Sequence, residues 1–121
     1  MSANTDTVRT YLDGFNASDH EKILGCLTDD IVWTVYGAYR IEGKAAYDEN
    51  IEGPGFDGPP RIEIVRMVEQ GDTVMAELTA EATRDTGEVM RLSMAEVFVM
   101  RGGLICERRA WVIELKGNEF K

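Results

Sequence analysis

The first third of the chain has the hydrophobic spacing of two helices followed by a strand. Between residues 6 and 16, apolar side chains recur at i, i+3, i+4 and i+7, which predicts an amphipathic helix facing the core with Val8, Tyr11, Leu12 and Phe15. The segment Ser-Asp-His-Glu at 18–21 fits a capping box, which predicts the start of a second helix whose apolar stripe is Ile23, Leu24 and Leu27. Residues 31–36 are almost all β-branched or aromatic and predict a strand that closes at Gly37.

The remainder predicts one short helix, one loop and a meander of strands. Residues 44–51 have the composition of a short helix, and the loop 52–60 contains all three prolines. Alternation with a period of two then predicts strands over 62–68, 74–83, 89–100 and 104–114, joined by glycine-containing turns. Helices followed by a meander predict a single α+β domain over residues 1–121, in which a strongly curved antiparallel or mixed sheet wraps around the N-terminal helices.

Charge and composition exclude several classes of partner. The formal net charge is -9, with 22 acidic and 13 basic residues, so nucleic acid and anionic membranes are excluded as partners. The polar first eight residues and the lack of a long apolar run predict a soluble, cytoplasmic protein. A single histidine, His20, and two distant cysteines, Cys26 and Cys106, predict neither a metal site nor a disulfide framework, although one disulfide between the two stays open. No nucleotide or flavin motif is present, so we expect no cofactor.

Four segments carry a resemblance to a known family. They are YLDGFNASD at 11–19, LTDDIVW at 27–33, IEGKA at 41–45 and AEVFVMRGGLICERRAW at 95–111. Their order and spacing resemble the nuclear transport factor 2-like superfamily, in its SnoaL-like and ketosteroid isomerase-like branch. The resemblance implies a conical half-barrel with an internal pocket. Because the superfamily includes ketosteroid isomerases, epoxide hydrolases, polyketide cyclases and noncatalytic modules, it does not by itself imply an activity.

The resemblance also places candidate catalytic groups. Ketosteroid isomerases need a carboxylate base and two acids that hold the enolate oxygen. Tyr11 falls where those enzymes carry their oxyanion tyrosine, and Glu96 where they carry a carboxylic acid. Their base comes from the end of the first strand, where this chain has Val35. The usual isomerase route is therefore not expected.

The hydrolase and cyclase comparisons lead to a similar result. Both imply an acidic residue on the last strand, at the position of Ala110. The arginine of the epoxide hydrolases aligns with Thr79, so that Glu81 is the remaining carboxylate. These mechanisms are therefore also not expected in their usual form.

The register of the last hairpin decides what Glu96 faces. If Arg101-Gly102-Gly103 is a three-residue loop, Glu96 lies directly opposite Arg108, whereas a two-residue loop places it opposite Arg109. The first register is preferred because it puts on one concave face Met94, Glu96, Phe98, Cys106, Arg108, Ala110 and Val112. Glu96 and Arg108 would then form a desolvated pair, in which deletion of one partner costs roughly 3–5 kcal/mol.

Two functional hypotheses follow. The first is a pocket protein, an isomerase, lyase or hydrolase that acts on a small apolar or aromatic molecule. Its candidate catalytic residues are Glu96, Tyr11 and Arg108, and its candidate ligand-binding residues are Phe15, Trp33, Tyr36, Tyr47, Phe56, Met94, Phe98 and Val112. The alternative is a noncatalytic ligand-binding or dimerisation module, in which the ion pair is structural and the aromatic residues fill the core.

A homodimer is expected under either hypothesis. It would form through the convex face of the sheet, where the outward-facing residues of the third strand of the meander mix apolar and polar groups. These residues are Arg91, Ser93, Ala95, Val97 and Val99.

Overall fold

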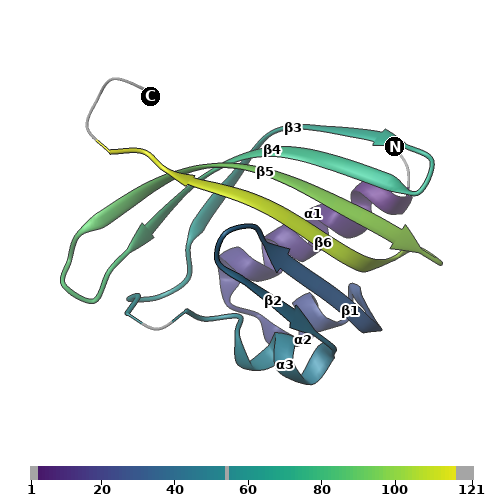
Figure 1. Ribbon diagram of the computed structural model, residues 1–121, viewed down its shortest axis with the longest axis horizontal. Helices are drawn as coiled ribbons and strands as arrows, with labels where there is room; N and C mark the ends of the chain where they lie inside the picture. The colour runs from purple at the N-terminus through teal and green to yellow at the C-terminus, as the bar shows by residue number, and fades with distance from the viewer. Residues whose placement is uncertain (1–2, 54, 117–121) are drawn as a thin grey trace.

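The computed structural model describes residues 3–53 and 55–116. Its helices are α1 (Ala3–Ala17), α2 (His20–Leu24) and α3 (Lys44–Glu49), and its strands are β1 (Leu27–Val35), β2 (Tyr39–Glu42), β3 (Arg61–Gln70), β4 (Thr73–Thr83), β5 (Val89–Arg101) and β6 (Leu104–Glu114). The predicted α+β class is confirmed, and the long strands fall where the alternation placed them (Figure 1).

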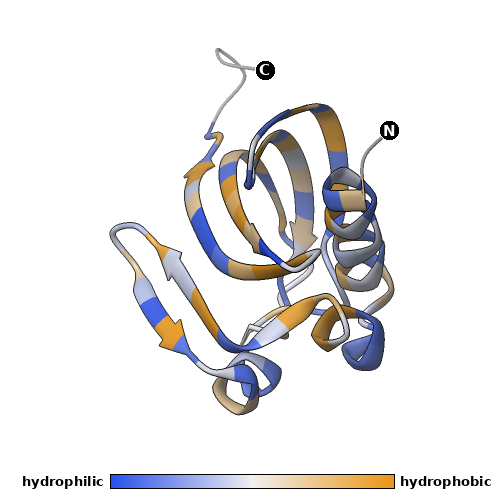
Figure 2. Ribbon diagram, turned by 90° about the vertical axis from the view of Figure 1, so that its right-hand side faces the viewer, coloured by the Kyte–Doolittle hydropathy of each residue, from blue (hydrophilic) through white to orange (hydrophobic). Residues whose placement is uncertain are grey.

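All strands belong to one mixed sheet in the order β2-β1-β6-β5-β4-β3. Neighbouring strands are antiparallel except β1 and β6, which are parallel. The sheet is curved and unclosed, and β3 to β6 arch over α1 (Figures 1 and 2). The predicted half-barrel around the N-terminal helices is therefore the observed architecture.

The core lies between α1 and the concave face of the sheet. The four residues of the predicted helical stripe are all buried, and β4 alternates between buried and exposed residues as its sequence predicts. Asn16 fixes the end of α1 to the start of β3, because its side chain donates to the Ile62 carbonyl at 2.9 Å and accepts from the Ile62 amide at 2.6 Å. Gly14 lets α2 pack closely, since a Cβ there would lie 2.9 Å from Cγ1 of Ile23.

The structure corrects the predicted start of α2. Asp19, not Ser18, is the N-cap, and its carboxylate accepts from the Lys22 amide at 3.1 Å. Ser18 instead has a positive φ of 52°, and its hydroxyl donates to Glu52 at 2.7 Å. The capping-box prediction is therefore wrong, because the tight turn between α1 and α2 moves the Ser18 side chain away from the new helix.

The beginning of the sheet also differs from the prediction. Strand β1 begins at Leu27, which is buried in the sheet and does not belong to the α2 stripe. The sequence analysis missed β2 altogether. Its pairing with β1 follows a turn at Gly37, which has a φ of 83°.

Neither predicted register of the last hairpin is correct. Gly102 and Gly103 both have positive φ and form a two-residue turn, so that Arg101 pairs with Leu104. The register then shifts by one residue between Val99 and Met100, which places Glu96 opposite Ala110. Because of this irregularity, Ile105 is fully buried, whereas Cys106, predicted on the concave face, is half-buried with its thiol bonded to the Val99 carbonyl.

The described residues also bear on the cysteines, on membrane-spanning helices and on metal-binding groups. Cys26 and Cys106 are both free, so the disulfide that the sequence left open is not formed. None of the helices in the described ranges has the length and hydropathy needed to cross a membrane. Within those same ranges, no group of three or more His, Cys, Asp or Glu side chains is placed so that it could hold a metal ion.

Candidate functional site

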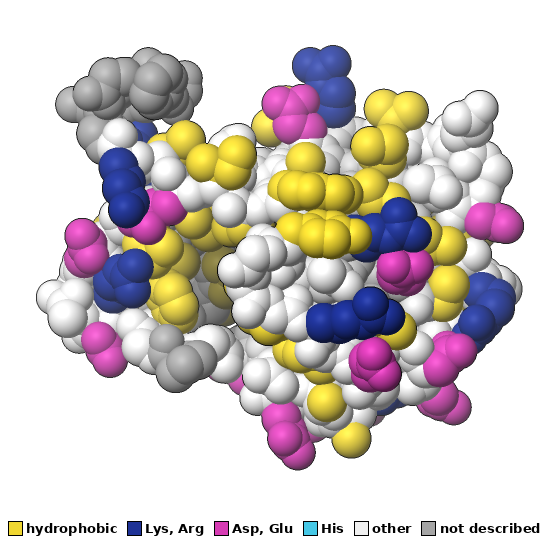
Figure 3. All heavy atoms as spheres, viewed as in Figure 1, with side chains coloured by type: hydrophobic (Ala, Val, Ile, Leu, Met, Phe, Trp, Pro, Cys, Tyr) yellow, Lys and Arg dark blue, Asp and Glu magenta, His cyan; other side chains and the backbone are white. Residues whose placement is uncertain are grey.

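A cavity of about 580 Å³ opens between the concave face of the sheet, the β1–β2 turn and the segment 50–60. Its wall is mainly apolar, and its aromatic side chains come from α1, β1, the β1–β2 turn, β2 and the 50–60 segment: Phe15, Trp33, Tyr36, Tyr39 and Phe56. Strand β5 adds Met90, Leu92 and Met94. The space-filling view shows the surface hollowed to the left of its centre, beside these elements (Figure 3). This size and lining are typical of a site for a small molecule.

Arg108 lies at the floor of this cavity in a doubly hydrogen-bonded ion pair with Glu96. Its Nε donates to Glu96 Oε1 at 3.0 Å and its Nη2 to Oε2 at 2.7 Å. The two side chains are 6% and 0% exposed. Such a planar, two-point pair fixes the orientation of the guanidinium. Arg108 therefore belongs both to the cavity wall and to the core.

Two tyrosines complete the shell around the guanidinium. Arg108 Nη1 donates to the Tyr47 hydroxyl at 3.2 Å and also to the Tyr11 hydroxyl, and the two hydroxyls are hydrogen-bonded to each other. The Arg108 Cζ atom lies 4.5 Å from the centre of the Trp33 ring and 5.2 Å from that of Phe15. Cation–π attraction adds to the hydrogen bonds at these distances.

The surroundings fix the charge of each group. Burial opposes the charge of Arg108, but the neighbouring Glu96 carboxylate and the two phenols raise its pKa well above the ordinary value. Burial raises the pKa of Tyr11 and Tyr47, against the opposing effect of Arg108. Both tyrosines are therefore neutral phenols at physiological pH, and both oxygens of Glu96 are occupied by Arg108.

The structure separates the predicted site residues into two groups. Arg108 and six of the predicted ligand-binding residues line the cavity: Phe15, Trp33, Tyr36, Phe56, Met94 and Val112. The others are fully buried behind the wall: Tyr11, Tyr47, Glu96 and Phe98. Their functional roles stay predictions. Sequence reasoning missed Tyr39 and Met90 as wall residues; Met90 could have been found from its alternation with Leu92 and Met94.

The positions at which the resemblance implies acids or bases hold apolar residues or face away from the cavity. Val35 lines the cavity, and the buried Ala110 pairs with Val35 on one side and Glu96 on the other. Thr79 and Glu81 both lie on the exposed face of β4. Among the described residues that line the cavity, Glu52 is the acidic residue, and it lies at the mouth.

At the mouth, His20 joins α2 to α3 and to the 50–60 segment. Its Nδ1 lies 2.5 Å from Asp48 Oδ1, and its Nε2 lies 2.8 Å from Glu52 Oε2. The hydrogen bonds with Asp48 and then Glu52 raise the pKa of His20 above the ordinary 6.5. The two carboxylate partners of His20 lie 28 and 32 residues away in sequence and were not predicted.

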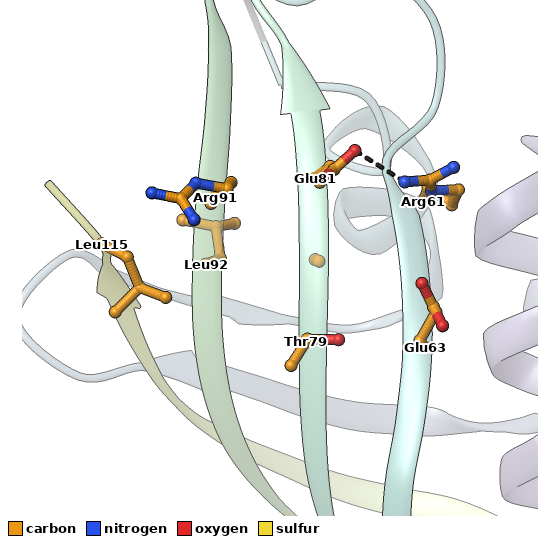
Figure 4. A pocket seen from close by; sticks show the side chains of 8 residues that line it. Arg61, Glu63, Thr79, Glu81, Arg91, Leu92 and Leu115 are labelled. Atoms are coloured by element: carbon orange, nitrogen blue, oxygen red, sulfur yellow. Dashed lines mark hydrogen bonds and ion pairs between the residues drawn. The ribbon is translucent and has the colours of Figure 1, made fainter. Parts of the chain in front are cut away.

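A second, shallower groove of about 200 Å³ is partly lined by outward-facing side chains of β3, β4 and β5 (Figure 4). Its main polar contact is an ion pair between Arg61 Nη2 and Glu81 Oε1 at 2.7 Å, and both side chains are exposed. Exposed pairs of this kind contribute little to stability. The larger cavity is therefore the candidate site.

A curved, unclosed six-stranded sheet around N-terminal helices defines the nuclear transport factor 2-like class of fold. The model of the SnoaL-like domain family matches residues 8–108, and the chain belongs to this family. The resemblance found in the sequence is thereby confirmed. No curated protein matches the chain significantly in sequence.

Three solved structures illustrate the breadth of this fold. An LEH-like epoxide hydrolase from M. tuberculosis has a TM-score of 0.81 and 20% identity, covering 92% of this chain and 83% of that one. TerC, co-crystallised with polyporic acid, has a TM-score of 0.81 and 25% identity, covering 90% of both chains. An NTF2-like protein of unknown function from Burkholderia pseudomallei has a TM-score of 0.81 and 19% identity, covering 91% and 90%.

Loss of the Glu96 charge is expected to destabilise the fold. Glu96→Gln leaves the buried Arg108 charge without its counterion, which costs roughly 3–5 kcal/mol of unfolding free energy. The matched control Glu107→Gln breaks the partly exposed pair with Arg109 and should cost less than about 1 kcal/mol. Urea unfolding measures both, and equal stabilities of the two variants would contradict the structural role of the pair.

The single histidine should titrate at a raised pKa. The folded-state pKa of His20 exceeds the ordinary value of 6.5. The contacts of His20 with Asp48 and Glu52 therefore stabilise the fold fully below about pH 6.5, and this contribution is lost as the pH rises through the raised pKa. NMR titration of His20 measures the value directly. Glu52→Gln should lower it, whereas Glu49→Gln, on the exposed side of α3, should leave it unchanged; a wild-type pKa at or below 6.5 would refute the prediction.

Proposed function

We propose that the protein binds a small, largely apolar or aromatic molecule in the cavity floored by Arg108. The observation that carries this proposal is a cavity of about 580 Å³ whose wall is formed mainly by aromatic and aliphatic side chains. Its volume is within the range of small-molecule sites, and its single cation is held rigidly at one end. TerC, which is 25% identical and was co-crystallised with polyporic acid, supports a ligand-binding role for this fold.

In this proposal Arg108 contacts the ligand, and Glu96 and Tyr11 act as positioning residues. Glu96 is fully buried and makes a two-point pair with Arg108, so it does not have the free, accessible oxygen that a general base requires. In an isomerase, lyase or hydrolase reaction, Arg108 would be the charged group that polarises the substrate. Binding without turnover needs none of these steps, and the geometry favours it. The cytoplasmic location expected from the sequence belongs to the same proposal.

A larger side chain inside the cavity should block binding. Met90 lines the cavity, and its neighbour Val89 lies exposed on β5. The probe is 2-acetylnaphthalene, a small aromatic molecule of the proposed ligand class. Met90→Trp should weaken its binding at least about tenfold, because the indole would occupy part of the ligand volume. Val89→Trp introduces the same side chain on the surface and should leave the affinity unchanged. Isothermal titration calorimetry measures both, and equal affinities in the two variants would place binding elsewhere.

The second proposal is a homodimer formed through the convex face of the sheet. Tyr36 and Trp111 stack there with ring centres 4.9 Å apart, although they are 51% and 43% exposed. Trp111 pairs with Ala95, and on the next row of the same face Met75 pairs with Val97 and Val68, so that two short apolar rows form an apolar band. Charged residues border it, since Glu77 lies opposite Ala95 and Arg109 opposite Val97. Apolar side chains gather near the middle of the face in Figure 3, between basic and acidic ones. Exposed apolar patches rimmed by polar residues mark association surfaces.

The expected interface includes the residues predicted from the sequence. Ser93 and Ala95 are exposed on the convex face and Val97 and Val99 are half-buried there, next to the Tyr36–Trp111 stack. Arg91 is half-buried farther along the same strand. This arrangement favours the dimerisation role that the sequence left open. Tyr36 would then contact both the interface and the cavity, because it stacks on Trp111 and also lines the cavity wall.

A charge in the middle of the apolar band should prevent association. Trp111→Glu places a carboxylate in the band and is expected to shift the chain from dimer to monomer at micromolar concentration, because a charge would have to be desolvated in the interface. Val89→Glu changes an exposed apolar residue roughly 20 Å away along β5 and should leave the dimer intact. Sedimentation velocity distinguishes these states, and a monomeric wild type would refute the proposal.

A further inference from the structure

One polar group at the cavity floor has no hydrogen-bond partner. Among the side chains that the structure describes, the buried nitrogen without a partner is Nε1 of Trp33. Trp33 is 5% exposed, and its ring lines the cavity. Almost all buried polar groups in native proteins are hydrogen-bonded, so an unpartnered indole N–H needs an explanation.

The neighbours of Trp33 explain why it has no partner within the chain. Its ring stacks on Tyr47 at 4.7 Å and meets Tyr39 and Phe15 edge-on at 5.3 and 6.2 Å. A further neighbour is the Arg108 guanidinium, which carries only donors. The Tyr47 hydroxyl is already bonded to Tyr11 and Arg108. The indole therefore lies among rings and a cation.

Arg108 provides a second donor beside the indole. A guanidinium has five N–H groups. The hydrogen bonds to Glu96, Tyr11 and Tyr47 use one on Nε, two on Nη1 and one on Nη2. The second N–H of Nη2 has no acceptor among the described residues, and the Cζ atom to which Nη2 is bonded lies 4.5 Å from the Trp33 ring centre. The two unused donors thus belong to side chains that contact each other and both line the cavity.

We infer that the ligand of this cavity is an aromatic compound with a neutral carbonyl oxygen, which accepts hydrogen bonds from the Trp33 indole and from Nη2 of Arg108. This inference rests on the proposed ligand-binding function and specifies the ligand class. A carbonyl oxygen has two lone pairs for two donors. A hydroxyl oxygen could accept the same bonds, but its own hydrogen, like that of an ammonium group, would meet no free acceptor on Trp33, Arg108 or Glu96.

Neutrality of the ligand follows from the charges and the space at the floor. Glu96 compensates the Arg108 charge at 2.7 Å, so the floor has no net charge for an anion to neutralise. The formal net charge of -9 also disfavours anions. In addition, the indole nitrogen is buried, so a carboxylate bonded to it would have to lose its water shell.

Three naphthalene probes test the inference in the unmodified protein. They share one ring system and differ in the group at position 2: 2-acetylnaphthalene has a neutral carbonyl, 2-methylnaphthalene has no acceptor, and 2-naphthoate is an anion. Titration calorimetry should find that 2-acetylnaphthalene binds about tenfold tighter than 2-methylnaphthalene, and tighter than 2-naphthoate, since two hydrogen bonds to otherwise unpaired donors are gained.

The two tryptophans supply a matched pair of variants. Trp33→Phe removes the indole N–H and keeps an aromatic ring, and it should weaken 2-acetylnaphthalene binding about fivefold while changing 2-methylnaphthalene binding less than about twofold. Trp111→Phe makes the same change on the convex face, outside the cavity, and should alter neither affinity. Circular dichroism of both variants verifies that the fold is kept.

The outcomes distinguish this inference from the function on which it rests. If 2-methylnaphthalene binds as tightly as 2-acetylnaphthalene, the carbonyl inference is overturned while the apolar pocket stands. Tightest binding of 2-naphthoate overturns the neutrality of the ligand. An equal loss of both neutral probes in Trp33→Phe shows that Trp33 is only a wall residue. Failure of every probe to bind the wild-type protein counts against the pocket function itself.

Discussion

The buried pair of Glu96 and Arg108 is the interaction on which the site depends. A guanidinium keeps its charge in a protein interior only when a counterion and hydrogen-bond acceptors replace the lost water. Here the acceptors come from three separate parts of the chain: Glu96 from β5, Tyr11 from α1 and Tyr47 from α3. The hydrogen bonds that Arg108 needs thus connect the sheet to two helices and fix the floor of the cavity.

The same pair limits the chemistry that the cavity can support. Glu96 acts as the counterion of Arg108, and the neighbouring positions Val35 and Ala110 are apolar. The floor consequently presents donors and aromatic surface, while Glu52 lies at the mouth. A protein with the same architecture at 20% identity is an epoxide hydrolase. The comparison illustrates that side chains within a shared fold, and not the fold itself, determine the reaction.

The sequence predicted which residues face inward better than it predicted which residues pair. The preferred register set Glu96 opposite Arg108, whereas the observed partner is Ala110, two residues farther along. Side chains alternate with a period of two, so an error of two residues keeps every side chain on its correct face. Glu96 and Arg108 were therefore correctly placed on one face. Cys106 was misplaced because it lies at the register shift, which no local pattern signalled.

Other parts of the site depend on contacts between distant segments and could not be predicted locally. The hydrophobic stripe places Tyr11 inside, but its bond to Tyr47 requires α1 and α3 to meet at the same arginine. The cluster of His20, Asp48 and Glu52 likewise joins α2 to the rim. Strand β2 is too short for its alternation to be distinctive, which also hid Tyr39.

The contrast between floor and rim indicates where the cavity opens. The floor is held by fully buried charged and aromatic groups, whose separation would expose unpaired polar atoms. The rim is held by exposed contacts, including His20 with Glu52 and the isolated bridge between Phe56 and Arg84. Exposed ion pairs and short bridges are weak, and segments held by them open at low free-energy cost. The rim formed by α2 with residues 50–53 and 55–60 is therefore the part of the cavity wall that can be displaced at the lower free-energy cost.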